Sequence, residues 1–271
     1  MTKLTTAQVV ALTSAQAGAL TPAQLAVFTT AQTRALETTD LQALTGAQVS
    51  ALGSTNVALL TSTQIGALKQ SQLSALTSTA VNALTSSQVG SLTTTQVAAF
   101  TFSQMSGFST TQLQGMTPEA LSKLDPGAFD SLSSSVISAM TTAQIAALSS
   151  GELGALTSTQ VKGLTTDQIV ALTTTQMPFL SAEALIGLST AQVKAIETVD
   201  IQKLKDVQIK VLSTANVAVL SATQITALTT AQAPALTTAQ MAVLNTSQVD
   251  ALSTTDIAVM SAAQNFSAEA S

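Results

Sequence analysis

The chain has 271 residues, of which 8% are charged, and its net charge is −5. It contains no Cys, His, Trp or Tyr, so it lacks the usual zinc ligands and the commonest general base. We therefore expect no catalytic, cofactor or metal site, and the sparse, net negative charge disfavours nucleic acid as a partner.

An eight-residue pattern begins at Leu4 and runs almost to the end of the chain. Its first copy is Leu4–Ala11, and the 33 first positions from Leu4 to Met260 are all apolar. Self-similarity at a fixed short period is the signature of a repeat architecture, in which neighbouring units stack. We number the positions of each octad from 1, with Leu4 as the first.

Each octad carries the residues that start a helix. Position 2 is Ser, Thr, Asp or Asn in 28 of the 33 octads, and position 5 is Gln in 22. This spacing predicts a capping box, and the apolar residues at positions 1 and 6 form the matching hydrophobic staple. Pro22 and Pro118 stand at position 3, the first helical residue, where a missing N–H costs nothing.

One continuous helix is excluded, because eight residues turn its apolar face by about 80° per octad. A cap every eight residues instead predicts helices of about six residues, which are marginal alone and depend on stacking. The predicted fold is therefore an all-α solenoid of very short capped helices. We expect position 7 to face water, and position 8, usually Ala or Gly, to allow close approach of neighbouring turns.

A β-solenoid is the alternative, since Thr, Val and Ile favour strands. Apolar residues at adjacent positions 8 and 1 spoil the alternation of a strand, and 12 Gly are few for tight corners. Pro178 and Pro234, both at position 7, argue against helix, because each removes a backbone donor inside the expected element.

We expect one repeat domain, 1–271, of about 33 octads, with an irregular middle near 100–140 and a short non-repeat tail, 265–271. Within it, Glu37-Thr38-Thr39-Asp40 recurs 160 residues later as Glu197-Thr198-Val199-Asp200. Asn56 and Asn216 show the same displacement. This correspondence indicates an internal duplication laid over the octads. No finer superperiod is visible, so the number of octads per turn stays open.

Two features interrupt the uniform surface and are candidates for an interaction patch. One is Phe102, in the irregular middle, and the other is a charged segment. A solvated face of mixed charge is one interpretation of that segment, and a partner site is the other. The two carboxylates at 197 and 200 are too few for calcium, so a role at a helix start explains them better. The candidate residues are Phe102, Lys194, Glu197, Asp200, Lys203, Lys205, Asp206 and Lys210.

Two resemblances to known proteins follow from these motifs. The six-residue stretches that begin at Leu20 and Met116, LTPAQL and MTPEAL, resemble the opening of a TAL-effector repeat, which implies a helix start and nothing about DNA. In composition and repeat style, the whole chain is similar to the Thr/Ala/Gln-rich repeat tracts of large bacterial surface and adhesin-like proteins. That resemblance implies a structural or adhesive role outside the cell.

The sequence thus predicts a structural rod, stalk or filament, with a protein-binding scaffold and an ice- or crystal-binding surface as alternatives. The first octad is as regular as any other, so we expect end-to-end association of the chain with itself, and other surface proteins are further candidate partners. An extracellular or cell-surface location is expected, although the N-terminus shows no signal peptide and no stretch is long enough for a membrane span.

Overall fold

The computed structural model describes residues 4–262 and 264–265. Within these ranges every regular element is helical, so the all-α prediction is confirmed and the β-solenoid is wrong. The described helices include none that is long and apolar enough to cross a membrane. Residues 266–271 of the predicted tail lie outside the described part of the chain.

The chain divides into two compact units, Met1–Met140 and Thr141–Ser271. The helices of the first unit are α1 (Thr6–Val10), α2 (Ser14–Gly18), α3 (Pro22–Leu25), α4 (Thr30–Arg34), α5 (Thr38–Ala43), α6 (Gly46–Ala51), α7 (Ser54–Ala58), α8 (Ser62–Ala67), α9 (Gln70–Ser74), α10 (Ser78–Asn82), α11 (Ser86–Gly90), α12 (Thr94–Val97), α13 (Phe102–Met105), α14 (Thr110–Gly115), α15 (Pro118–Leu121), α16 (Pro126–Asp130) and α17 (Ser134–Ser138).

The helices of the second unit are α18 (Thr142–Ala147), α19 (Ser150–Ala155), α20 (Ser158–Lys162), α21 (Thr166–Val170), η1 (Met177–Phe179), α22 (Ala182–Gly187), α23 (Thr190–Ala195), α24 (Thr198–Ile201), α25 (Asp206–Val211), α26 (Thr214–Ala218), α27 (Ala222–Thr226), η2 (Ala233–Ala235), α28 (Thr238–Met241), α29 (Thr246–Val249) and α30 (Thr254–Val259).

The predicted capping box starts most of these helices. In α12, the Thr93 hydroxyl accepts a hydrogen bond from the Gln96 N–H at 3.3 Å, and Gln96 Oε1 accepts from the Thr93 N–H at 2.8 Å. The cap backbone is extended, with φ −75° and ψ 162°, as an N-cap requires. Each helix therefore begins where the octad pattern predicts, and the next cap ends it after four to six residues.

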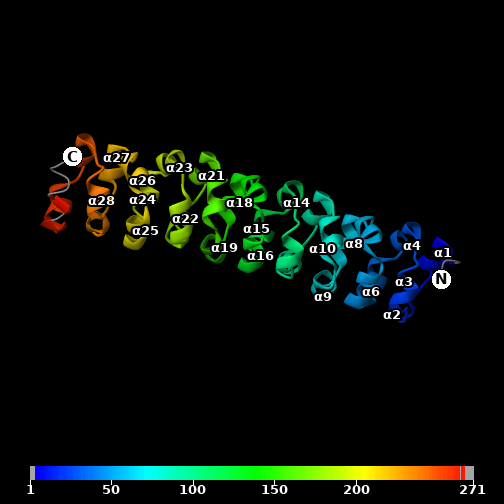
Figure 1. Ribbon diagram of the computed structural model, residues 1–271. Helices are drawn as coiled ribbons and strands as arrows, with labels where there is room; N and C mark the ends of the chain where they lie inside the picture. Colours follow the sequence, from blue (N-terminus) through cyan, green and yellow to red (C-terminus); the bar gives the residue numbers. More distant parts are fainter. Residues whose placement is uncertain (1–3, 263, 266–271) are drawn as a thin grey trace. The chain divides into compact units, whose positions relative to one another are not determined.

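Each unit is a coil with three octads per turn. In the first unit α2 packs against α5 and α11 against α14, and in the second α22 packs against α25 (Figure 1). In every pair the partner belongs to the third octad along the chain. The structure thus supplies the number of octads per turn, which the sequence left open.

The coil interior is built from positions 1 and 6. Leu68 at position 1 and Ile65 at position 6, for example, are 3% and 0% exposed. Position 7 is exposed or half-buried, as expected, throughout the described octads. Position 8 approaches the next turn closely: a Cβ on Gly115 would lie 2.5 Å from the Ser86 carbonyl oxygen, and Gly187 is equally confined by Ser158.

Two octads depart from α-helix because of proline. Pro178 and Pro234 have no N–H to donate to the residue four before, and their octads form the 3₁₀ turns η1 and η2 instead. The expected conflict is thus resolved by tightening one short turn. The middle of the chain, near 100–140, loses several Gln residues but keeps its helices, and Phe100 and Phe108 are buried there with ring centroids 6.0 Å apart.

The caps can be tested at α12. Thr93→Ala removes the hydroxyl that accepts from the Gln96 N–H, and we expect the free energy of unfolding to fall by about 1 kcal/mol in a denaturant titration. Thr95→Ala, at an exposed non-capping position of the same octad, is the matched control and should change stability by less than about 0.5 kcal/mol. Equal losses for the two variants would contradict the capping role.

Candidate functional site: the glutamine ladder and the charged segment

The buried glutamine at position 5 joins each turn to the one before it. In the octad of α23, Gln192 is 2% exposed and its Oε1 accepts from the Ser189 N–H at 2.8 Å. Its Nε2 donates to the carbonyl oxygens of Val161 and Leu164, each at 2.7 Å, in the preceding turn. One side chain therefore caps its own helix and binds the neighbouring turn.

This contact recurs with a constant separation of 28 residues between the glutamine and the carbonyl at position 1. We call the set of these contacts the glutamine ladder. The position-1 carbonyl accepts no backbone hydrogen bond in the described octads, so the glutamine supplies its donor. In the first unit the pairs are Gln32–Leu4, Gln48–Leu20, Gln64–Leu36, Gln72–Leu44, Gln88–Leu60, Gln96–Leu68, Gln104–Leu76 and Gln112–Leu84. In the second they are Gln176–Leu148, Gln192–Leu164, Gln208–Leu180, Gln224–Ile196, Gln232–Leu204, Gln240–Leu212, Gln248–Leu220 and Gln264–Leu236.

Shorter side chains replace the glutamine in two ways. Asn56 and Asn216, the pair related by the internal duplication, donate through Nδ2 to Phe28 at 2.9 Å and to Leu188 at 3.0 Å, again 28 residues back. Where position 5 is Ala184, the Ser181 hydroxyl donates to the Leu156 carbonyl at 3.2 Å. The position-1 carbonyl thus recruits another donor when the glutamine is absent.

Acidic residues at position 5 break the ladder. Asp40 and Asp200 are 2% and 3% exposed, and in each one carboxylate oxygen has no hydrogen-bond partner. Burial, and then the negative charge of Glu197, raise the pKa of Asp200. A carboxylate cannot donate to a carbonyl, so these octads lack the bond that asparagine makes at the same position.

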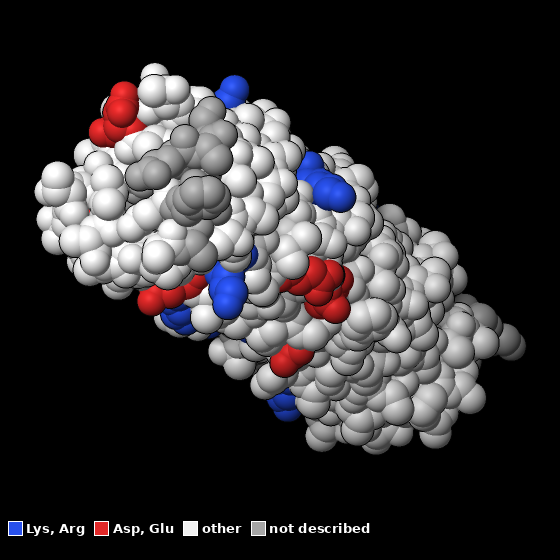
Figure 2. All heavy atoms as spheres, turned by 60° about the vertical axis from the view of Figure 1, so that its left-hand side comes forward, with Lys and Arg blue, Asp and Glu red and all other residues white. Residues whose placement is uncertain are grey.

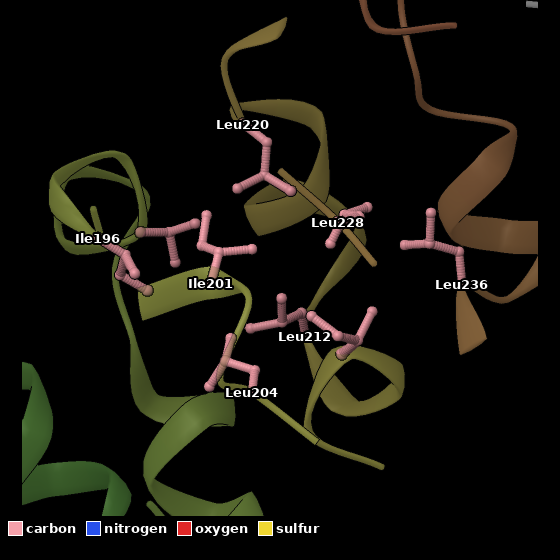
Figure 3. A pocket seen from close by; sticks show the side chains of 9 residues that line it. Ile196, Ile201, Leu204, Leu212, Leu220, Leu228 and Leu236 are labelled. Atoms are coloured by element: carbon pink, nitrogen blue, oxygen red, sulfur yellow. The ribbon is translucent and has the colours of Figure 1, made fainter. Parts of the chain in front are cut away.

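The interior of the second unit holds a small apolar cavity of about 10 Å³. Its lining consists of aliphatic side chains from positions 1 and 6, among them Ile201, Leu212 and Leu228, which point into the coil (Figure 3). A space of this size holds at most one water, and the lining has no polar group to retain it. The cavity is therefore a packing gap in the core and offers no ligand site.

The charged segment does not form one site. Lys194, Glu197, Lys203, Lys205, Asp206 and Lys210 are exposed, whereas Asp200 is buried, so Asp200 cannot be part of a surface patch as the sequence suggested. Lys194 and Glu197 line one open hollow of about 430 Å³, and Asp206 and Lys210 line another of about 330 Å³. Figure 2 shows how sparsely charged side chains are distributed on the visible face.

Two aromatic side chains are exposed in different units. Phe102, in the first unit, is 59% exposed and lies at the start of α13. In the second unit, Lys205 Nζ lies 5.7 Å from the ring centroid of the 48% exposed Phe179, which forms a cation–π contact within the charged segment. The sequence analysis did not single out Phe179, because its position in the octad gave no sign that Lys205 would reach it.

The described residues include no group of three or more His, Cys, Asp and Glu side chains that could hold a metal ion. The position-2 hydroxyls are engaged as helix caps, as at Thr93 and Thr165. The most extensive polar arrangement is thus the glutamine ladder, which binds turn to turn.

The ladder predicts a contrast between interior and end glutamines. Gln192→Glu keeps an oxygen for the Ser189 N–H but leaves two buried carbonyls without a donor, so we expect a loss of about 3 kcal/mol in the free energy of unfolding. Gln16→Glu is the matched control, because Gln16 is exposed and only its Oε1 forms hydrogen bonds. Similar losses in both variants would show that the amide nitrogen makes no net contribution.

The buried carboxyl of Asp200 predicts a pH effect. Asp200→Asn supplies the missing donor, and we expect about 1 kcal/mol more stability at pH 7. The raised pKa means that the folded wild type is favoured below the ordinary carboxyl pKa and loses this advantage as the pH rises through the folded value. The gap between variant and wild type should therefore shrink on acidification to pH 3.5. A gap that is constant with pH would contradict this account, and exposed Asp250→Asn is the control.

Comparison with known proteins agrees with the repeat seen in the structure. The model of the ALTTAQ repeat matches residues 33–70, 70–102, 121–158, 150–182, 193–230 and 201–238. No curated protein matches the chain. The matched residues amount to more than half of the sequence, and the chain therefore belongs to the ALTTAQ repeat family.

Proposed function

We propose that this repeat protein is a non-enzymatic structural element that forms a rod, stalk or filament at the bacterial cell surface. The observation that carries the proposal is the glutamine ladder, in which each turn binds the turn before it at a constant separation of 28 residues. Such a coil lengthens by addition of octads without a change in its cross-section. Length, as the property under selection, accounts for a chain that repeats one octad with so little variation.

The surface location and the absence of catalysis rest on composition. Ser and Thr hydroxyls are abundant, but those at position 2 accept from backbone N–H groups, and the chain has no His to activate a nucleophile. The engagement of the same hydroxyls as caps also weighs against an ice- or crystal-binding surface. The similarity in repeat style to large bacterial surface proteins supports an extracellular role.

A protein-binding scaffold is the second candidate. It is favoured by exposed apolar side chains that a purely structural coil does not require, namely Phe102 in the first unit and Phe179 and Val207 in the second, which are 59%, 48% and 67% exposed. Side chains of this kind are enriched in the centres of interfaces. The pairing of Phe179 with Lys205 would give such a site a cationic edge.

Electron microscopy and sedimentation velocity of the purified chain, over a hundredfold range of concentration, distinguish the two functions. The structural role predicts elongated assemblies that grow with concentration, and little response to salt because charged residues are few. Discrete particles at every concentration would contradict self-assembly and favour the scaffold.

A further inference from the structure

The first three octads of the chain have glutamines whose amide nitrogens are not used. Gln8 and Gln16 are exposed and Gln24 is half-buried, whereas Gln192 in the interior is 2% exposed. In all three the Oε1 atom accepts from the cap N–H, at 2.9, 3.0 and 2.8 Å, so the side chains are held in the same orientation as the interior ones. Their Nε2 groups lack only an earlier turn to bind.

The last octads have the complementary deficit. The final described rung joins Gln264 to Leu236, so the position-1 carbonyls of Leu244, Leu252 and Met260 receive no glutamine. Apolar side chains are uncovered at the same place: Ile257 at position 6 is 41% exposed, whereas Ile225, at position 6 of an interior octad, is 0% exposed. This end thus presents three acceptors and part of a stacking face.

Donors and acceptors match in number, spacing and register. If a second copy continued the octad frame after Met260, its Leu4 would follow eight residues later. The constant separation of 28 residues would then place its Gln8, Gln16 and Gln24 opposite the carbonyls of Leu244, Leu252 and Met260 of the first copy. The geometry points to a head-to-tail joint in which three glutamines of one copy extend the ladder of another. This inference rests on the proposed filament and assigns its contact.

The joint is polar. The N-terminal face offers N–H donors and the C-terminal face offers carbonyls, so two faces of one kind cannot pair. A contact between unlike faces generates a filament, or a ring where the rotation closes. Each added copy also covers apolar side chains that both faces expose, which supplies most of the driving force, while the three glutamines determine which faces meet.

A triple variant, Gln8→Glu, Gln16→Glu and Gln24→Glu, tests the joint. A glutamate preserves the cap, as Ser149 and Glu152 show at 2.7 Å, but it donates nothing and turns a negative charge toward the acceptors. The matched control is Ala98→Glu, Ser106→Glu and Ala146→Glu, which adds the same charge at exposed position-7 sites. Circular dichroism and melting should show that both variants fold like the wild type.

Sedimentation velocity then measures association. We expect the wild type and the control to assemble alike, and the triple variant to associate at least about 100-fold more weakly. Since its C-terminal face is intact, the triple variant should also shorten wild-type assemblies when added in a small proportion, by adding at one end only.

The outcomes separate this inference from the proposed function. Assembly of the triple variant at wild-type strength would overturn the glutamine joint and leave the filament standing. Failure of the triple variant to shorten wild-type assemblies would overturn the polarity of the joint. A strictly monomeric wild type over the whole concentration range would overturn the filament itself, and the joint with it.

Discussion

The structure depends on a glutamine that is used at both ends of its amide. Oε1 accepts from the N–H of the cap three residues earlier, and Nε2 donates to the preceding turn, as Gln192 does with Ser189 and Leu164. Helices of four to six residues are too short to be stable alone. The same side chain that starts each helix therefore supplies the tertiary contact that stabilises it, so local and long-range structure form together.

This coupling explains how the chain tolerates its irregular octads. Loss of the glutamine at one position removes a single rung, and the neighbouring turns are still held by the apolar residues at positions 1 and 6. Asn216 keeps the rung with a shorter side chain, and Ser181 replaces it with a hydroxyl. Asp200 has neither solution, and the cost there is a buried carboxyl with a raised pKa.

The helix starts could be predicted from sequence because caps are local. Thr93 and Gln96 lie three residues apart, so their spacing alone predicts both hydrogen bonds. The burial of positions 1 and 6 followed from the same register. The three-octad turn could not be predicted, because every octad is almost alike and no residue marks a corner.

The second use of the glutamine was also missed, although the sequence contains a signal for it. A capping box works with Glu as well as with Gln, yet position 5 has 22 Gln and only Glu152 as an acidic residue of the same length. That preference is understandable only if the amide nitrogen has a buried acceptor. The burial of Asp200 follows from the same rule, which places every position-5 side chain against the previous turn, and the contact of Lys205 with Phe179 depends on the coil geometry.

Side-chain amide hydrogen exchange, measured by NMR, tests the central claim most directly. The account predicts that the Nε2 protons of Gln192 and Gln240, which donate to buried carbonyls, exchange as slowly as the backbone amides of the core. Those of Gln8 and Gln16, which have no preceding turn, should exchange like a free amide under conditions where the chain is monomeric. Fast exchange at Gln192, at the rate of Gln8, would contradict the ladder.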